Sequence, residues 1–118
     1  MTPPQPQLTL NLTQGSVSLK FSPEAAINLQ KALAELMQSL KVATQTSGSG
    51  GKPNPQKPME YQFTGDVFLE LFCNPNIYPS PFAAKVLVTL RDDRIRLSTE
   101  AELTRLIEDV NQYLEQVG

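Results

Sequence analysis

Apolar and polar residues alternate along three stretches of this 118-residue chain, and a period of two predicts β-strands. In the first stretch, residues 8–21, leucine, valine and phenylalanine alternate with threonine, asparagine, serine and lysine. Gly15 lies between its two alternating runs. This pattern predicts a β-hairpin with one apolar face and one polar face.

The second stretch runs from Met59 to Cys73 and keeps most of its apolar residues at odd positions. It is longer than the roughly 3–10 residues of a typical strand. Either Gly65 and Asp66 form a tight turn between two strands, or Gly65 bends one long strand. Because the odd-numbered phase continues through the glycine, we favour the bent strand.

The third stretch, residues 84–97, contains the sequence RDDR at positions 91–94. Apolar side chains recur at even positions before this segment, and Ile95 and Leu97 continue the pattern between arginines after it. Polar residues of this kind favour a turn. The stretch therefore predicts a second hairpin.

A first helix is predicted to begin at Pro23, which suits the first helical position. Ser22 is the expected N-cap, and Glu24 faces the positive end of the helix dipole. We expect this helix to end near residue 42. Its apolar stripe at helical spacing consists of Ala26, Leu29, Leu33, Leu36, Met37 and Leu40.

A second helix is predicted at the end of the chain. Thr99 and Glu102 match a capping box, with Ser98 as a competing cap. Its apolar stripe consists of Leu103, Leu106, Ile107, Val110, Leu114 and Val117.

Two segments have compositions that do not favour a packed structure. Residues 1–6 are rich in proline and glutamine, and residues 44–58 contain glycine and serine followed by proline and polar residues. Neither segment has enough apolar residues to offset the entropy of ordering it. We interpret residues 1–6 as a disordered tail and residues 44–58 as a flexible linker, with a mobile lid or docking segment as the alternative for the linker.

The expected element order is ββα-linker-βββα, or ββββα in the second half if Gly65 makes a turn. Runs of strands between helices favour the α+β class, with an antiparallel sheet of about five strands and both helices on one face. We expect residues 7–118 to form a single domain.

Two residue types that catalytic and metal sites commonly use are absent or rare in this chain. The chain has no histidine, the commonest general base and metal ligand, and Cys73 is its only cysteine. Asp92 and Asp93 lie in the predicted turn, and Glu108 and Asp109 are assigned to a solvated helix face. We therefore predict no enzymatic activity, no catalytic residue, no metal site and no cofactor.

The N-terminal sequence MTPPQPQLTLNL lacks the basic region and the continuous apolar region of a signal peptide. No apolar run approaches the ~20 residues of a membrane helix. The formal net charge of −2 gives no overall attraction to nucleic acid or to an anionic membrane. We expect a cytoplasmic protein with no membrane partner.

The even-numbered phase of the second stretch should face solvent, yet it carries Phe68 and Phe72, and Leu87 shares the same expected face. One explanation is that the loop after this stretch folds back and covers these side chains. The apolar residues of that loop are Ile77, Tyr78 and Phe82. The other explanation is an open apolar patch, which commonly marks a protein interface.

We favour an interaction or accessory module that binds another protein or a second copy of itself. The expected binding residues share one surface of the second half of the chain: Phe68, Phe72, Tyr78, Phe82 and Leu87, with Arg94 and Arg96 as a charged rim. A module that binds single-stranded nucleic acid through the same face is the alternative, which the net charge disfavours. A third hypothesis is a small-ligand binder or an enzyme whose pocket the sequence does not reveal.

Overall fold

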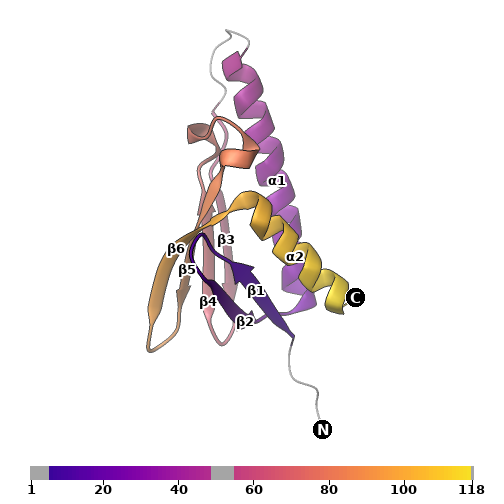
Figure 1. Cartoon of the computed structure of the whole chain (residues 1–118), viewed down its shortest axis with the longest axis vertical. Coiled ribbons are helices and arrows are strands. Elements are labelled where there is room, and N and C mark those ends of the chain that lie inside the picture. Colours follow the sequence, from indigo (N-terminus) through magenta and orange to yellow (C-terminus); the bar gives the residue numbers. More distant parts are fainter. Residues whose placement is uncertain (1–5, 49–54, 118) are drawn as a thin grey trace.

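A computed structural model describes residues 6–48 and 55–117 of the chain (Figure 1). Residues 1–5 of the predicted tail (1–6) and residues 49–54 of the predicted linker (44–58) lie outside the described residues. In chain order the elements are β1 (Gln7–Asn11), β2 (Ser16–Lys20), α1 (Pro23–Gly48), β3 (Met59–Thr64), β4 (Phe68–Cys73), the short 3₁₀ helices η1 (Pro75–Ile77) and η2 (Pro81–Ala83), β5 (Lys85–Arg91), β6 (Arg96–Glu102) and α2 (Leu103–Val117).

The described chain belongs to the α+β class with antiparallel sheets, as its sequence predicts. The strands form two sheets: β1 pairs with β2, and a four-stranded sheet has the order β3-β4-β5-β6. The first hairpin is therefore separate from the main sheet. The prediction of one sheet of about five strands was wrong in this detail, because strand pairing between the two halves of the chain does not occur in the described residues.

Gly65 lies in a turn between two strands, so the favoured interpretation of a bent strand was wrong and its alternative was right. Thr64 pairs with Phe68, and the Gly65 N–H donates a hydrogen bond to the Val67 carbonyl at 3.3 Å. This register sets odd positions opposite odd positions, as in the pairing of Phe63 with Leu69. The apolar phase consequently continues across the turn, and phase alone does not distinguish a turn from a bend.

Both helices and the first hairpin lie on one face of the four-stranded sheet, which we call the inward face (Figure 1). The Phe21 ring, which follows β2, lies 4.6 Å from the Phe63 ring on β3. The Tyr61 hydroxyl, also on β3, donates a hydrogen bond to the Ala25 carbonyl at 3.2 Å. The inward side chains of the central strands are all buried: Leu69, Leu71, Cys73, Val86, Val88 and Leu90.

α1 continues to Gly48, so the predicted helix end near residue 42 was wrong. Adding a turn to an existing helix costs little, since nucleation has already occurred, and polar residues can extend it beyond the apolar stripe. On the other side of the undescribed segment, Gln56 is held by η1. Its N–H donates to the Asn76 side-chain oxygen at 2.8 Å, and its carbonyl accepts from the Asn76 amide at 2.8 Å.

α2 begins at Leu103, directly after β6 ends at Glu102. The predicted capping box was therefore wrong. Ser98, Thr99 and Glu102 all pair with residues of β5, so the strand ladder extends through the segment that local sequence assigned to a helix start. The Leu103 N–H donates to the Ala84 carbonyl at 3.1 Å. No helix in the described part of the chain is long and apolar enough to cross a membrane.

Candidate functional site

The face of the four-stranded sheet opposite the helices, which we call the outward face, carries its side chains in rows that run across the strands. The register of the strands defines three of these rows. They are the arginine row (Thr64, Phe68, Arg91, Arg96), the middle row (Gln62, Glu70, Thr89, Ser98) and the glutamate row (Glu60, Phe72, Leu87, Glu100).

The arginine row lies at the end of the sheet that contains both hairpin turns. The Arg91 guanidinium carbon lies 4.4 Å from the centroid of the Phe68 ring, a cation–π contact. Arg96 is the cross-strand neighbour of Arg91, so two positive charges lie side by side. Half-buried Phe68 is thus covered on one side by a cation of its own chain.

Arg94 lies beside this row, in the turn between β5 and β6. The Asp92 carboxylate accepts hydrogen bonds from the backbone N–H groups of Arg94 and Ile95, both at 2.8 Å. These two bonds lower the pKa of Asp92. The turn therefore holds its own carboxylate and fixes where the Arg94 backbone lies.

The glutamate row has an apolar centre and charged ends. Phe72 and Leu87 are cross-strand neighbours; Phe72 is half-buried and Leu87 is 45% exposed. Glu60 is the neighbour of Phe72 on β3, and Glu100 is the neighbour of Leu87 on β6. Both glutamates are exposed. An apolar pair thus lies between two carboxylates.

The middle row separates Phe68 from Phe72. The Gln62 side-chain amide donates a hydrogen bond to the Glu70 carboxylate at 3.0 Å. Thr89 is only 7% exposed although it lies on the outward face. The apolar residues of this face are therefore divided by polar groups and do not form one continuous patch.

A hollow of about 320 Å³ adjoins the glutamate row at Leu87. Thr13 and Gln14, from the turn of the first hairpin, form part of its lining, together with Ser98, Thr99 and Glu100. The Thr13 N–H donates to the Glu100 carbonyl at 3.0 Å, which holds this turn at the edge of β6. The outward face is consequently recessed beside Leu87.

The loop between β4 and β5 does not provide the apolar cover that self-packing would require. Ile77 is 66% exposed and Phe82 is 83% exposed. Tyr78 packs against the buried core, and its hydroxyl donates to the Lys85 carbonyl at 3.1 Å. Burial is the main cause that raises the pKa of Tyr78. The short helices η1 and η2 of this loop contact α1, and η2 also contacts α2.

The seven predicted binding residues therefore fall into two groups. Phe68, Phe72, Leu87 and Arg96 share the outward face, with Arg94 at the adjoining turn. Tyr78 and Phe82 belong to the loop that contacts the helices. Sequence reasoning missed Glu60 and Glu100 as flanking positions and placed Arg91 in the turn, whereas it pairs with Phe68, because only the strand register shows which side chains are neighbours of the phenylalanines.

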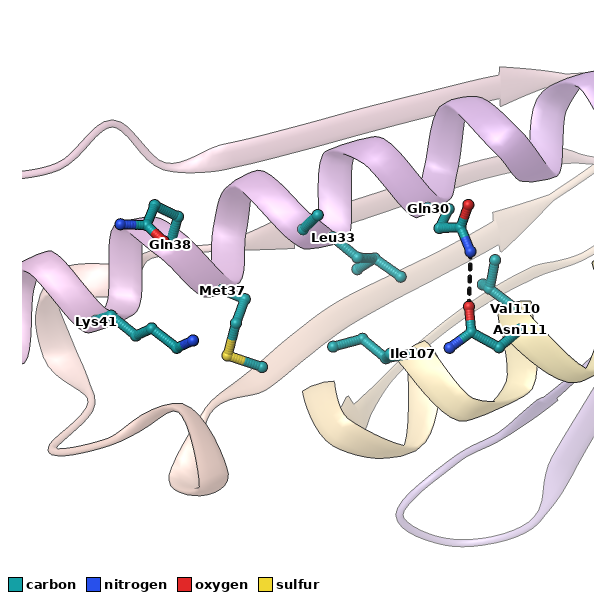
Figure 2. A pocket seen from close by; sticks show the side chains of 9 residues that line it. Gln30, Leu33, Met37, Gln38, Lys41, Ile107, Val110 and Asn111 are labelled. Atoms are coloured by element: carbon teal, nitrogen blue, oxygen red, sulfur yellow. Dashed lines mark hydrogen bonds between the residues drawn. The ribbon is translucent and has the colours of Figure 1, made fainter.

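A second recess lies between the two helices (Figure 2). This groove has a volume of about 420 Å³. Met37 of α1 and Ile107 of α2 face it, and both are half-buried. The Gln30 amide donates to the Asn111 side-chain oxygen at 2.8 Å and bridges the helices beside the groove. The sequence pattern assigned Met37 and Ile107 to the core and gave no signal of a groove.

Two buried titratable side chains are Asp109, which is hydrogen-bonded to Asn11, and Cys73, which lies in the hydrophobic core. Asp109 is only 4% exposed, so its assignment to a solvated helix face was wrong. Its carboxylate accepts hydrogen bonds from the backbone and side-chain nitrogens of Asn11, both at 2.8 Å, and lies 3.6 Å from the Arg105 Nε.

Burial raises the pKa of the Cys73 thiol to about 11. In the described residues, no cluster of three or more cysteine or acidic side chains is placed to hold a metal ion.

Comparisons with protein-family models, with curated proteins and with solved structures found no match to this chain.

Proposed function

We propose that this protein is a non-enzymatic interaction module that binds another protein through the outward face of its four-stranded sheet. The observation that carries the proposal is the glutamate row, in which Phe72 and Leu87 form an apolar pair flanked by carboxylates. Aromatic residues surrounded by a polar rim are typical of the centres of protein interfaces. The recess beside Leu87 gives this face a shape that a partner side chain can enter.

Charge favours a protein partner over a nucleic acid. Glu60, Glu70 and Glu100 lie on the same face as Arg91 and Arg96, so a phosphate backbone would meet carboxylates as well as guanidinium groups. Stacking platforms for single strands need open aromatic faces. The Phe68 ring already has the Arg91 guanidinium over one face. Binding to single-stranded DNA or RNA that weakens steeply with salt would support the nucleic-acid alternative instead.

The experiment compares two matched surface variants in cross-linking and capture from lysate of the native host. Leu87→Glu places a charge at the centre of the proposed interface. Ile27→Glu is the control, because Ile27 on α1 has the same exposed fraction as Leu87, 45%. We expect a partner protein or a second copy to be captured by wild type and by Ile27→Glu but not by Leu87→Glu. Equal capture by all three proteins would reject this face as the binding site.

The groove between the helices favours a second candidate function, the binding of a small apolar ligand. Its volume of about 420 Å³ lies within the range of ligand sites, and it combines apolar side chains with amide groups. A medium-chain fatty acid is a suitable probe in an NMR titration. Shifts confined to groove residues, and lost in Ala34→Trp, would support ligand binding, whereas no shift in wild type would exclude it for this class of ligand.

A further inference from the structure

We infer that the partner of the outward face is a second copy of this chain, arranged so that the strands of the two sheets run in opposite directions. This inference rests on the proposed function and names the occupant of the same site. It follows from the order of charges along the three rows: the arginine row lies at one end of them and the glutamate row at the other. Beyond the glutamate row, Lys85 and Glu102 form one further outward pair of opposite charges. A surface with such a polarity is complementary to its own copy when one copy is reversed.

The symmetry fixes which rows meet. In a dimer of facing sheets, the two-fold axis lies in the plane of the interface, and an axis perpendicular to the strands reverses their direction. With the axis at the middle row, the arginine row of one copy lies opposite the glutamate row of the other. Arg96 then faces the second copy's Glu100, and Phe68 faces the second copy's Phe72. Each contact occurs twice, as in every isologous interface.

Within one chain these charges cannot reach one another. Arg96 and Glu100 are both on β6 and four residues apart, which is roughly 13 Å at about 3.3 Å per residue. In the described chain neither side chain takes part in an ion pair. Their opposite charges therefore remain available to a reversed copy, which would bring them together at both ends of the interface.

The recess beside Leu87 also fits this arrangement. Glu100 and Leu87 line it, and the first hairpin supplies Thr13 and Gln14 as its outer wall. A reversed second copy directs its Arg96 side chain toward this recess. The aliphatic part of the second copy's Arg91, which lies opposite Leu87, can then cover Leu87 while the guanidinium of its Arg96 meets the Glu100 carboxylate.

A copy with parallel strands is less complementary. In that arrangement the two-fold axis runs along the strands between β4 and β5, and the arginine rows of both copies lie at the same end. Glu60 then faces the second copy's Glu100, which places like charges together at both sides. The reversed arrangement has one comparable cost, because Glu70 lies opposite its own copy at the centre.

The size of the face predicts weak association. Four strands about 4.8 Å apart and three rows give a face roughly 15–20 Å on each side. Such a contact buries on the order of 450–800 Å² in total, below the roughly 1,000 Å² of a stable specific interface, so the association is weak and transient. We expect a dissociation constant on the order of 10–100 µM at low salt.

The test is a charge exchange followed by sedimentation equilibrium of the full chain at low salt. Arg96→Glu and Glu100→Arg should each raise the dimer dissociation constant about tenfold or more, since each substitution creates two like-charge contacts. The double variant should return to within about threefold of wild type, because the exchanged charges meet again across the interface. Glu70→Gln should tighten the dimer by about threefold. Unfolding by urea checks that all variants fold like wild type.

Several outcomes would overturn the inference: a wild-type protein that stays monomeric, single variants without effect, or a double variant that does not recover. The last result would mean that Arg96 and Glu100 do not meet across the interface. These outcomes are separable from failure of the proposed function. A monomeric wild type that still captures a different protein through Leu87 retains the interaction module and loses only self-association.

Discussion

The two faces of the four-stranded sheet carry similar apolar residues but have different surroundings. On β4, Leu69 and Leu71 point inward and are fully buried, while Phe68 and Phe72 point outward and are half-buried. The inward face is covered by two helices and the first hairpin (Figure 1). The apolar character of a strand position therefore does not determine its burial; the elements packed against that position do.

The difference also separates stability from recognition. A side chain that is enclosed in the core contributes to folding through the apolar area it removes from water. A half-buried side chain on an uncovered face contributes less to the monomer and retains apolar area for a partner. The two phases of one strand are thus expected to respond differently to the same kind of substitution.

The largest expected effect comes from shortening the inward leucines. Leu71→Ala and Leu69→Ala should each lower the free energy of unfolding by about 2–5 kcal/mol, because the loss of buried methyl groups adds to the cost of a cavity. Phe72→Ala and Phe68→Ala remove more atoms but should cost only about 1 kcal/mol in the monomer. Urea unfolding, at concentrations below any dimerisation, measures all four variants. Equal losses for leucine and phenylalanine variants would show that the strand is buried on both faces.

A second prediction concerns how the cover of the inward face is held together. Asp109 on α2 is hydrogen-bonded to Asn11 on β1, so it joins the second helix to the first hairpin. Asp109→Ala should lower the free energy of unfolding by about 1–3 kcal/mol, since it leaves buried or half-buried donors without acceptors.

Glu108→Ala is the matched control for this prediction. Glu108 is exposed and forms only a loose ion pair with Arg105, at 3.6 Å. Its removal should change stability by less than about 0.5 kcal/mol. If both variants unfold at the same urea concentration, the contact between the hairpin and α2 does not stabilise the cover.

A third prediction is that the buried thiol of Cys73, on the inward face, makes the stability of the protein depend on pH. Burial raises the pKa of Cys73 from its ordinary value of 9.0 to about 11, so folding stabilises the protonated thiol. This contribution is fully present below pH 9 and is lost as the pH rises toward 11. Tyr61, whose pKa burial raises to about 12, acts in the same direction at higher pH. In Cys73→Ala, urea midpoints should fall less steeply between these pH values than in wild type; an unchanged slope would contradict the assignment.

Period-two patterns were sufficient for the two faces of β4, since they placed Leu69 and Leu71 inward and Phe68 and Phe72 outward. They were wrong for Ile95, which was also expected to point inward but lies in the turn before β6 and is 65% exposed. They were insufficient wherever the answer depended on pairing between distant residues. The Gly65 turn preserves the phase, and β6 extends through Ser98 and Thr99 because its ladder with β5 outweighs a local helix cap. The sequence pattern also placed Phe72 and Leu87 on the same predicted binding face. Glu60 and Glu100 flank this pair because of the register between strands, and a local sequence pattern contains no information about that register.

The smallest expected effect is on the outward face, at the contact between Arg91 and Phe68. The guanidinium lies 4.4 Å from the ring centroid, in a solvent-exposed setting where a cation–π contact contributes about 0.5–1 kcal/mol. Arg91→Ala should lower the free energy of unfolding by that amount, about 0.5–1 kcal/mol. Arg94→Ala is the control, because this substitution keeps the backbone N–H that donates to Asp92. Thermal unfolding at low and high salt measures both variants. A loss for Arg91→Ala that persists in high salt indicates contact with the ring, whereas equal and salt-sensitive changes in both variants would indicate only a change in net charge.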